Sequence, residues 1–575
     1  MVKFKMRNIE IANILYEIAE LLELNEIAYK PRAYRRAAQN IEMLSDDIEN
    51  LYNEGKLDDI PGVGKSIASK IQEYIETGDL KYLNDLRSQI PHGLQDLLRV
   101  EGIGPKTAKI LYKDLAIKNV DELELAINKG KLKNIKGFGQ KKEENLLQAI
   151  KLYKTSQERF VLGDILPIAK IIKSKFEKLK TVINVEFAGS IRRRKETIGD
   201  IDLLVVSKQP KNVMDVFTSL PEIKKIISSG EIKSTIVLNN NLQVDLTIVD
   251  ESSYGSALQY FTGSKEHNIQ LRSLAKRNKM KLNEFGLFNL IDNKKIAGSK
   301  EAEIYELLGL SYIQPELREN RGEIELAKVR KLPNLVNLAD IKGDLHIHTR
   351  WSDGSNSIEE IAIAAKNLGY NYIAICDHSK ALKIAGGLNE DDLKVQMIEI
   401  ERINRKLEEL RILCGVEANI DLEGKLDLNN SILKDLDFVV ASIHSGFKQG
   451  EEINVKRVLN AMHNDYVNCI GHPSGRIINK RAPAILNFSK IFEEAEKLNI
   501  FLEINAFPDR LDLSDLNCFK AGEFNINFSI GSDAHNLHQL SYMDYGVSVA
   551  RRGWLESKKI LNAMNLNQLK KVLRL

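Results

Sequence analysis

The sequence predicts a multidomain protein of α+β and α/β class, with helical domains first, a sheet-based middle part and a β/α barrel last. Apolar residues in the first 155 positions follow the three-to-four spacing of amphipathic helices, as at Ile11, Ile14 and Ile18. After residue 181 the pattern changes to short β-rich runs separated by turns. Beyond about residue 340, short apolar strands alternate with helical stretches, which is typical of a β/α barrel.

Size and composition narrow the class of protein. A chain of 575 residues is too long for one core, and 43% hydrophobic residues can fill four or five folded units. No run of about eighteen apolar residues occurs, and the N-terminus is periodic and acidic, so we expect a cytoplasmic protein without a membrane segment. The cysteines lie far apart and form no CxxC pair, which predicts reduced thiols at Cys376, Cys414, Cys469 and Cys518.

Charge and histidine are unevenly distributed. Residues 1–340 carry 54 Lys and Arg against 48 Asp and Glu, a net +6, whereas residues 341–575 carry 29 against 32, a net −3. A mild positive excess suits a polyanionic partner, although many ordinary proteins show as much. Eight of the ten histidines lie in the last 235 residues, which predicts a metal site there.

One pattern recurs three times in the helical region: an apolar residue, then Gly-apolar-Gly, then the start of a helix. Glycine permits a tight turn and lets a DNA phosphate approach the backbone amides at the helix N-terminus. Lysines that could neutralise phosphate follow closely, at Lys65, Lys106 and Lys141. A single copy would more often be structural, but three predict DNA binding. They resemble helix-hairpin-helix motifs, which grip the backbone without reading sequence; the glycines are Gly62, Gly64, Gly102, Gly104, Gly137 and Gly139.

The middle region contains three carboxylates with the spacing of a metal site. Asp200 and Asp202 alternate along a predicted strand, so both side chains face the same side. Asp245, flanked by apolar residues, can add a third carboxylate from a neighbouring strand. Such a trio suits two Mg²⁺ ions about 4 Å apart. One Asp alone would more often be a turn or strand-edge residue, but the combination disfavours that interpretation.

A glycine-led basic segment, GSIRRR (189–194), precedes the carboxylates. Ser190 and Arg193 can hydrogen-bond the β and γ phosphates of a nucleoside triphosphate, where they would neutralise charge that shifts during phosphoryl transfer. The segment and the carboxylates together predict nucleotidyl transfer.

Residues 1–315 resemble DNA polymerase beta and its relatives in family X. GSIRRRKETIGDIDLL matches the family's Gly-Ser-x-Arg-Arg and Asp-x-Asp motif, and SYGSALQYFTGSKEHNIQLR (253–272) matches its thumb signature. The resemblance implies that Arg159 and Gly189 join the triphosphate site. It also implies a sugar contact by Tyr260, Phe261 and Gly263, a minor-groove base contact by Asn268 and a template contact by Arg272. An aromatic pair in a helix is otherwise more often part of a core.

The first 80 residues resemble the small 5′-phosphate-binding domain of this family. KPRAYRRAAQNI (30–41) provides Lys30 and Tyr34 as DNA contacts. PGVGKSIASKI (61–71) places Lys70 where some members carry a lysine that forms a Schiff base with deoxyribose phosphate. A helix lysine is more often simply solvated, and Ser66 occupies the motif's next basic position, so lyase activity is a hypothesis.

The C-terminal part contains nine potential metal ligands. His346 and His348 alternate on a predicted strand, and most of the others follow later strands, where β/α barrels place their active sites. Nine nitrogen and oxygen ligands without thiolate exceed the need of one tetrahedral ion, so we expect two or three ions of Zn²⁺, Mn²⁺ or Fe²⁺ acting on a phosphoester. The set is His346, His348, Asp353, His378, Glu417, His444, His472, Asp533 and His535.

This set, in the order HxHT, SDG, DH, E, H, H and SDAH, resembles the PHP (polymerase and histidinol phosphatase) family. Together with the segment YIQPELRENRGEIELA, it resembles the bacterial and archaeal family X polymerases that carry a PHP domain. The resemblance implies a distorted, seven-stranded, TIM-like barrel with 3′–5′ exonuclease, 3′-phosphatase and abasic-site endonuclease activities. All nine expected ligand positions are filled.

The predicted function is gap-filling DNA synthesis in base excision repair, by a monomer acting on gapped or primer-template DNA and dNTPs. One alternative is a histidinol-phosphate type phosphatase fused to an inactive nucleotidyltransferase, which leaves the three hairpins unexplained. Another is a non-catalytic DNA scaffold, which the complete ligand sets oppose. The expected parts are an N-terminal domain (1–80), fingers (81–155), palm (156–250), thumb (251–315), linker (316–340) and PHP domain (341–575).

Overall fold

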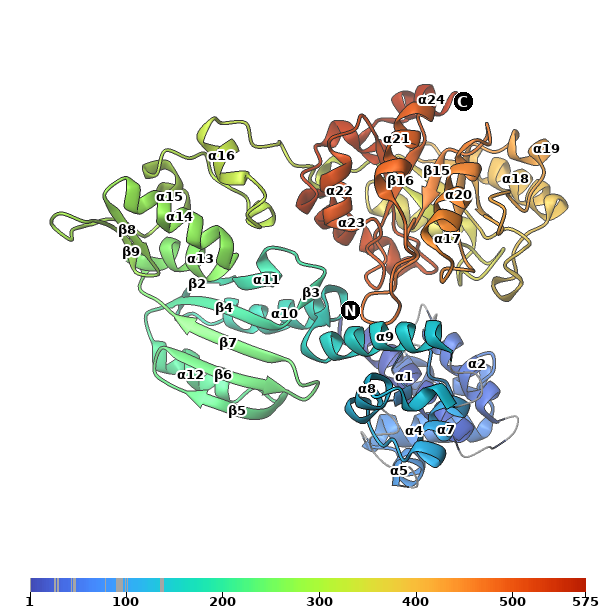
Figure 1. The fold of residues 1–575 in the computed structure, drawn as a ribbon, viewed down its shortest axis with the longest axis horizontal. Coiled ribbons are helices and arrows are strands. Elements are labelled where there is room, and N and C mark those ends of the chain that lie inside the picture. The colour runs from blue at the N-terminus through green and yellow to red at the C-terminus, as the bar shows by residue number, and fades with distance from the viewer. Residues whose placement is uncertain are drawn as a thin grey trace.

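The structure is a computed structural model. In Figure 1 the palm and thumb lie on one side, and the C-terminal barrel and the N-terminal helices lie on the other. Among the described residues, none of the helices combines the length and the apolar character needed to cross a bilayer. The described residues are 2–24, 27, 30–42, 44, 48–77, 79–88, 97–98, 100, 102–134 and 139–575.

The N-terminal helices share one hydrophobic core. Ile11 and Ile18 of the first helix belong to the same buried cluster as Leu111 and Ile150, so this core spans both helical units expected from the sequence. The amphipathic spacing seen in the sequence therefore builds one packed module. Its helices are α1 (Val2–Leu24), α2 (Lys30–Glu42), α3 (Ile48–Asn53), α4 (Lys65–Thr77), α5 (Lys81–Ser88), α7 (Pro105–Leu115), α8 (Val120–Asn128) and α9 (Gln140–Glu158).

Two hairpins of this module have matching backbone bonds. The Val63 amide donates to the Ile60 carbonyl over 2.9 Å, and the Ile103 amide donates to the Val100 carbonyl over 3.0 Å. Both central side chains, Val63 and Ile103, are buried. The preceding glycines have positive φ angles, +83° at Gly62 and +88° at Gly102. The repeated sequence pattern therefore gives a repeated turn.

Exposed glycines stand directly before three helices of the module. Gly64, Gly104 and Gly139 precede α4, α7 and α9, and no atom of the described residues lies within 4 Å of where their Cβ atoms would be. The first amides of each helix can therefore be approached closely by an anion. Gly137 of the third hairpin lies outside the described residues, as do the side chains of Lys106 and Lys141.

The palm is a five-stranded sheet of order β2-β4-β7-β6-β5, in which β4 and β7 run parallel and the other neighbours antiparallel. Ile201 and Leu203 of β4 face the hydrophobic cluster built with α10 (Leu162–Glu177). Leu204 instead packs with Ala257 on the opposite face. The strands are β2 (Val182–Phe187), β4 (Asp200–Ser207), β5 (Ile223–Ser229), β6 (Lys233–Leu238) and β7 (Gln243–Ile248), with α11 (Gly189–Arg192) and α12 (Pro210–Thr218) between them.

The thumb packs α13 (Tyr254–Thr262), α14 (Lys265–Arg277) and α15 (Glu301–Leu307) with a three-stranded sheet of β8 (Met280–Asn283), β9 (Gly286–Asn289) and β10 (Lys295–Ala297). Residues 316–340, expected as a linker, contain α16 (Glu323–Lys328) and contribute buried side chains to the thumb cluster. These are Leu317, Ile324, Ala327 and Leu335.

The C-terminal domain is a barrel of seven parallel strands, paired in chain order from β11 to β17. Two backbone bonds between its outermost strands close it: the Asp533 amide donates to the His346 carbonyl over 3.0 Å, and the His348 amide to the Ala534 carbonyl over 2.9 Å. The strands are β11 (Gly343–Ile347), β12 (Tyr372–Ile375), β13 (Arg411–Asn419), β14 (Phe438–Ser442), β15 (Cys469–Gly471), β16 (Phe501–Asn505) and β17 (Phe528–Gly531).

Helices surround the barrel, and α24 (Leu566–Leu573) closes its amino-terminal end. Leu569 packs with Tyr372, Phe438 and Phe501, the first residues of three strands. The opposite end, at the carboxyl ends of the strands, is therefore the end that can hold a site. The other helices include α17 (Ile358–Asn367), α18 (Glu390–Asn404), α20 (Glu451–Met462), α21 (Phe488–Leu498), α22 (Asp515–Ala521) and α23 (Met543–Arg552).

The barrel packs directly on the palm. Arg476, at the barrel mouth, pairs with Glu196 of the palm over 2.6 Å. Asn479 donates from Nδ2 to the carbonyl of Arg159 over 2.8 Å. Leu162 and Ile165 of α10 belong to the same buried cluster as Ile373 and Val416 of the barrel strands. Contacts between the two domains therefore include apolar packing, a hydrogen bond and a partly buried ion pair.

Candidate active sites

Three carboxylates meet on the palm sheet. Asp202 lies directly opposite Asp245 in the parallel pairing of β4 and β7, and Asp200 stands two residues earlier on β4. One oxygen from each carboxylate lies within 4.8 Å of the others. Since Ile201 and Leu203 face α10, alternation turns the carboxylates to the other face of the sheet.

Glycine at position 189 makes room for this cluster. Gly189 begins α11 with a φ of +58°, and a Cβ atom at this position would overlap Asp202 Oδ2. The backbone on either side is fixed, because the Ala188 amide donates to the Asp202 carbonyl over 2.9 Å. A residue with a side chain would therefore displace the carboxylate.

The electrostatics of the trio favour a cation. Burial raises the pKa of Asp202 to about 7, and the charges of Asp200 and Asp245 add to this effect. Burial and Asp245 also raise the pKa of Asp200. Closely spaced carboxylates destabilise one another unless a positive ion lies between them. An all-oxygen donor set is the set that Mg²⁺ prefers.

Arg193 lies where the palm meets the thumb. Its Nε donates to Glu319 Oε1 over 3.0 Å, and its Nη1 donates to the Thr262 carbonyl. A Cβ atom at Gly263, which has a φ of +70°, would come within 3.1 Å of Nη1. The positive charge of Arg193 offsets a small part of the rise in the pKa of Asp202 that burial causes, so this guanidinium lies close enough to act on the carboxylate cluster. Ser190 is half-buried on α11, the short helix whose C-terminal cap is Arg193.

The other predicted nucleotide contacts have protein partners in this structure. Arg159 donates from Nε to Thr197 Oγ1 over 3.0 Å, and its charge offsets part of the rise in the pKa of Asp200 that burial and Asp245 cause. Asn268 donates from Nδ2 to the Tyr260 carbonyl and accepts from Gln259 Nε2, both over 2.7 Å.

Three further predicted contact residues of the thumb lie on α13 and α14. Tyr260 and Phe261 form an edge-to-face pair with ring centroids 5.3 Å apart, and both are half-buried. Arg272 is exposed on α14 and donates from Nε to the Asn268 carbonyl over 3.3 Å.

Lys70 and Tyr34 lie in one aromatic cluster of the N-terminal module. The Lys70 amine lies 4.7 Å from the centre of the Tyr82 ring, which stacks on Tyr34 with centroids 6.4 Å apart. The amine also donates to the Ser66 carbonyl over 3.0 Å. Partial burial lowers the pKa of Lys70, and the nearby positive charge of Lys30 adds to this.

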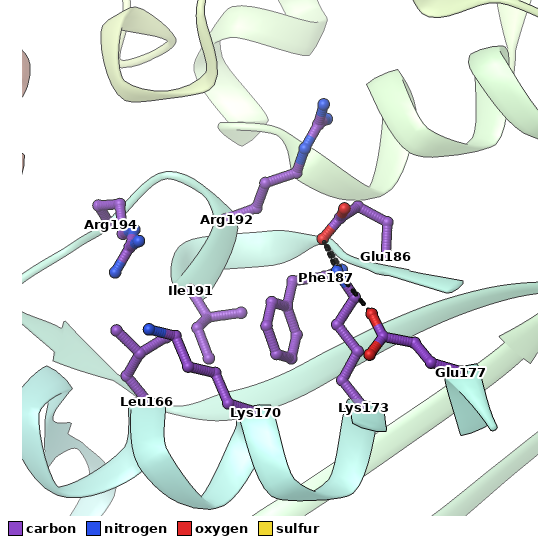
Figure 2. A pocket seen from close by; sticks show the side chains of 9 residues that line it. All are labelled: Leu166, Lys170, Lys173, Glu177, Glu186, Phe187, Ile191, Arg192 and Arg194. Carbon is purple, nitrogen blue, oxygen red and sulfur yellow. Dashed lines mark hydrogen bonds and ion pairs between the residues drawn. The ribbon is translucent and has the colours of Figure 1, made fainter. Parts of the chain in front are cut away.

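A cavity of about 380 Å³ lies between α10, β2 and α11 and has Leu166, Phe187 and Ile191 in its lining (Figure 2). Lys173 crosses one side, paired with Glu186 over 2.9 Å and with Glu177 over 3.7 Å. None of the predicted site residues lines this cavity, so it is separate from the carboxylate cluster.

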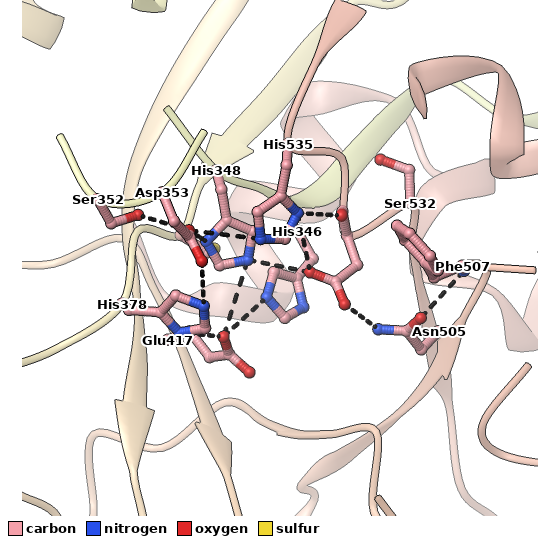
Figure 3. A network of polar contacts seen from close by, with 12 residues as sticks. His346, His348, Ser352, Asp353, His378, Glu417, Asn505, Phe507, Ser532 and His535 are labelled. Carbon is pink, nitrogen blue, oxygen red and sulfur yellow. Dashed lines mark hydrogen bonds and ion pairs between the residues drawn. The ribbon is translucent and has the colours of Figure 1, made fainter. Parts of the chain in front are cut away.

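The nine predicted ligands of the barrel come together at its carboxyl-terminal mouth. The alternation of strand residues explains the placement: Phe438, Val440 and Ser442 share one face of β14, starting from the apolar floor, and His444 lies two residues beyond the end of this strand. Figure 3 shows the imidazoles of His348, His378 and His535 gathered around Asp353 and Glu417.

Glu417 is at the centre of the barrel cluster. Its carboxylate lies 2.8 Å from His378 Nδ1 and 2.8 Å from His472 Nε2. His444 Nε2 lies 3.2 Å away and His346 Nε2 3.6 Å away.

Two further carboxylates complete the barrel cluster. Asp533 lies 3.0 Å from His348 Nε2, and Asp353 lies 3.5 Å from His378 and 3.4 Å from His535. The ligand atoms form three overlapping groups, which is an arrangement for more than one ion.

Unsatisfied buried atoms support cation binding in the barrel. Both nitrogens of His348, both carboxylate oxygens of Glu417 and Nε2 of His346 are buried without a hydrogen-bond partner among the described residues. Buried polar atoms in proteins are normally satisfied, so such a convergence of donor atoms fits a site that binds cations. Although burial opposes it, His444 and His378 hold the pKa of Glu417 well below its usual value.

Several supporting residues were not predicted from the sequence. Glu503 accepts from His346 Nδ1 and from the His472 amide, each over 2.6 Å. Asn505 donates to Asp533 over 3.0 Å, and Asn419 lies 3.2 Å from His444 Nδ1. Such partners fix the orientation of metal ligands. The one available signal was an acidic residue within the otherwise apolar strand IFLEINA.

Comparison with known protein families finds, in order along the chain, the same domains that the structure shows. The matched families are a helix-hairpin-helix domain (6–80), a SAM-like helix-hairpin-helix tandem (94–152), the DNA polymerase beta palm (164–272), the DNA polymerase beta thumb (257–319) and the PHP domain (344–506). DNA polymerase/3′-5′ exonuclease PolX of Bacillus subtilis (strain 168) is 38% identical over 572 residues, which cover 99% of this chain and 100% of that protein. The chain belongs to the family X DNA polymerases that carry a C-terminal PHP domain.

Other relatives match parts of this family X chain. A protein named as a probable phosphatase in Thermoanaerobacter sp. (strain X514) is 33% identical over 243 residues, 40% of this chain and 94% of that protein. DNA polymerase lambda of Rattus norvegicus is 22% identical over 342 residues, 54% of this chain and 56% of that protein. The predicted fold class and family resemblance are confirmed. The PHP match ends at residue 506, whereas the barrel continues through β17 to the ligands Asp533 and His535.

Proposed function

We propose that this protein is a DNA-directed DNA polymerase that fills gaps during DNA repair and carries a 3′–5′ exonuclease in its PHP barrel. The observation that carries the proposal is the convergence of Asp200, Asp202 and Asp245 on one face of a family X palm. The relative with the full-length match is named as an enzyme with both activities.

In the polymerase site, the three carboxylates would hold two Mg²⁺ ions. Such ions would assist attack of the primer 3′-hydroxyl and stabilise the leaving pyrophosphate. Ser190 and Arg193 would hold the triphosphate, Arg193 by exchanging its bond to Glu319 for bonds to phosphate oxygens. Tyr260, Phe261 and Gly263 of the thumb would bound the sugar.

The DNA would be held through its backbone by the hairpins. Gly64, Gly104 and Gly139 leave the helix N-termini open to phosphate, and Lys65 directly follows the first of these turns. Asn268 and Arg272 would contact the base pair being formed and the template. Gapped or primer-template DNA is the partner that these contacts fit best.

In the barrel, the nine ligands would hold two or three ions of Mn²⁺, Zn²⁺ or Fe²⁺. When bound, such ions would activate water and stabilise the oxygen that leaves the phosphorus. Arg510 lies 3.6 Å from Asp533 at this mouth and could neutralise part of the substrate phosphate. The same hydrolysis would act on a 3′-terminal nucleotide, a 3′-phosphate or the chain beside an abasic site.

Primer extension on a gapped duplex tests the polymerase. Asp202→Ala and Asp200→Ala should each abolish incorporation while leaving 3′–5′ degradation intact. Unaltered incorporation by either variant would refute the assignment.

A second candidate function is hydrolysis of a small phosphomonoester in the barrel. The similarity of this domain to nearly the whole of a probable phosphatase favours it. Histidinol phosphate and a 3′-terminal oligonucleotide, offered to the same protein, distinguish the two. Faster hydrolysis of histidinol phosphate than of the oligonucleotide would indicate that the barrel acts mainly as a small-molecule phosphatase.

Lyase activity at Lys70 is a further proposal, supported by the lowered pKa of its amine, because a Schiff base forms from neutral lysine. Borohydride should trap an adduct with 5′-deoxyribose-phosphate DNA in the wild type and not in Lys70→Ala. Absence of an adduct in the wild type would remove the proposal.

A further inference from the structure

A buried cluster of charges joins the barrel domain to the nucleotide site of the palm. Arg552, the last residue of α23, donates from Nη1 to the Arg193 carbonyl over 2.7 Å and to Glu319 Oε1 over 3.0 Å. The same oxygen of Glu319 accepts from Arg193 Nε over 3.0 Å. The side chains of Arg552, Glu319 and Arg193 are only 4%, 12% and 11% exposed. One carboxylate oxygen therefore serves two arginines from different domains.

The second nitrogen of the Arg552 guanidinium and the Arg552 carbonyl are also held. Its Nη2 donates to Asp515 Oδ2 over 2.8 Å, and Asp515 pairs with Arg321 over 3.0 Å. Arg321 in turn donates to the Arg552 carbonyl over 3.2 Å. Because its guanidinium and its carbonyl are both held, Arg552 has little freedom to leave Glu319. Its charge therefore stays beside Arg193.

We infer that Arg552 is a positioning residue of the polymerase site, which acts on the incoming nucleotide through Arg193. The inference rests on the proposed function, in which Arg193 binds the triphosphate. Arg552 fixes the backbone of Arg193 through its carbonyl. It also shares the negative charge of Glu319, so that Glu319 holds the Arg193 guanidinium less tightly and phosphate oxygens can replace it.

A second contact from the barrel domain also holds the main-chain carbonyl of an arginine in the palm. Asn479 donates to the carbonyl of Arg159, the other arginine assigned to the triphosphate. The barrel domain thus anchors the main chain of both arginines and not only the outer surface of the palm.

Arg551 provides a matched control. This neighbouring arginine also links the barrel domain to the polymerase part, through Glu316 over 2.7 Å and the Val336 carbonyl over 3.0 Å. Its third hydrogen bond runs to Asn337 Oδ1, so within the described part of the chain its hydrogen bonds reach neither Glu319 nor Arg193. Arg551→Ala therefore removes a comparable contact between domains and leaves the Arg193 cluster in place.

Single-nucleotide insertion on a gapped duplex, measured at varied dNTP concentration with the full-length protein, tests the inference. We expect Arg552→Ala to raise KM for dNTP roughly three- to tenfold, the net scale of one ordinary hydrogen bond because Arg552 acts only through Arg193, with kcat changed less than about twofold. Arg552→Lys should recover part of the loss, and Arg551→Ala should behave as the wild type.

Two double variants separate positioning from general damage. Adding Arg552→Ala to Arg193→Ala should raise KM no further, because Arg552 acts through Arg193. Adding Glu319→Gln to Arg552→Ala should return KM towards the wild-type value, because the carboxylate that would hold Arg193 alone is gone. Arg552→Lys keeps a positive charge beside Glu319 and Asp515, so it serves if Arg552→Ala folds poorly.

The outcomes are distinguishable. If wild-type protein does not extend the primer, the proposed function fails before any variant is compared. If it does, an unchanged KM in Arg552→Ala, an equal rise in Arg551→Ala, or additive effects with Arg193→Ala would each overturn the inference.

Discussion

Gly189 and Asp202 are so close that a methyl group on the glycine would overlap Oδ2 of the carboxylate and approach its Cγ to 3.2 Å. The two residues lie on different elements, α11 and β4. The shape of the polymerase site is therefore set by a missing side chain as much as by the carboxylates.

Gly189→Ala should reduce nucleotide incorporation by at least about 100-fold, because a ligand displaced by about 1 Å loses its catalytic geometry. The 3′–5′ nuclease should remain. Gly309→Ala is the control, since Gly309 also has a positive φ, +76°, but no atom of the described residues lies within 4 Å of its Cβ position. Steady-state insertion kinetics compare the two, and equal losses would contradict this explanation.

Glu301 should control the acid stability of the thumb. It pairs with Arg318 and Arg192. Although burial opposes it, these arginines lower the pKa of Glu301 to about 2. The folded pKa lies below the usual value of 4.5, so this stabilisation is complete above about pH 4.5 and is lost as the pH falls through about 2.

Glu301→Gln should destabilise the protein by about 3–5 kcal/mol at neutral pH, because two buried arginines lose their counter-charge. Its stability should also depend less on pH between about 5 and about 2. Urea unfolding at several pH values measures both effects. Glu303→Gln, which removes an exposed carboxylate 3.9 Å from Lys300, should change stability by less than about 1 kcal/mol; an equal change in both variants would argue against a buried network.

Replacing both His346 and His348 with alanine should remove bound metal and 3′–5′ degradation, while primer extension continues at the separate palm site. Elemental analysis and a nuclease assay measure the two losses. His463→Ala is the control, because His463 is exposed outside the cluster and pairs with Glu494 over 3.1 Å. Degradation that persists in the double variant would move the nuclease elsewhere.

Glu503→Gln should weaken metal binding in the barrel roughly 10- to 100-fold, because His346 and the His472 backbone lose their charged acceptor. Competition with a chelator measures the affinity. Glu494→Gln removes the comparable carboxylate–histidine pair outside the barrel, and metal affinity should then be unchanged. If Glu503→Gln binds metal normally, its bond to His346 has no role in orienting the ligand.

Side-chain periodicity accounts for the parts of both sites that were visible in the sequence. Asp200 and Asp202 were predicted to share a face because strand residues alternate, and the parallel pairing brings Asp245 opposite Asp202. The barrel ligands were predicted because they follow apolar strands. The sequence could not show Glu503 as a partner of His346, because 157 positions separate them and only the closed barrel brings them together.

In segment 316–340, a charged composition does not mean that the side chains are exposed. Its charged composition indicated a linker, yet Arg318 is fully buried against Glu301, and Glu323 is buried against His267. Arg318 and Glu323 each have a partner elsewhere in the chain, so the local sequence pattern gives no sign that these two residues are buried. The burial of Leu317 and Ile324 in the thumb is equally hidden by these charged neighbours.

The barrel is closed by a main-chain hydrogen bond between Asp533 and His346, two residues whose side chains both belong to the ligand cluster at its mouth. A chain cut after residue 506 would lose the last strand, two of nine ligands and the hydrogen-bonding partner of the first strand. The exposed strand edges that remained would invite pairing between molecules, so such a fragment should aggregate before it could bind metal.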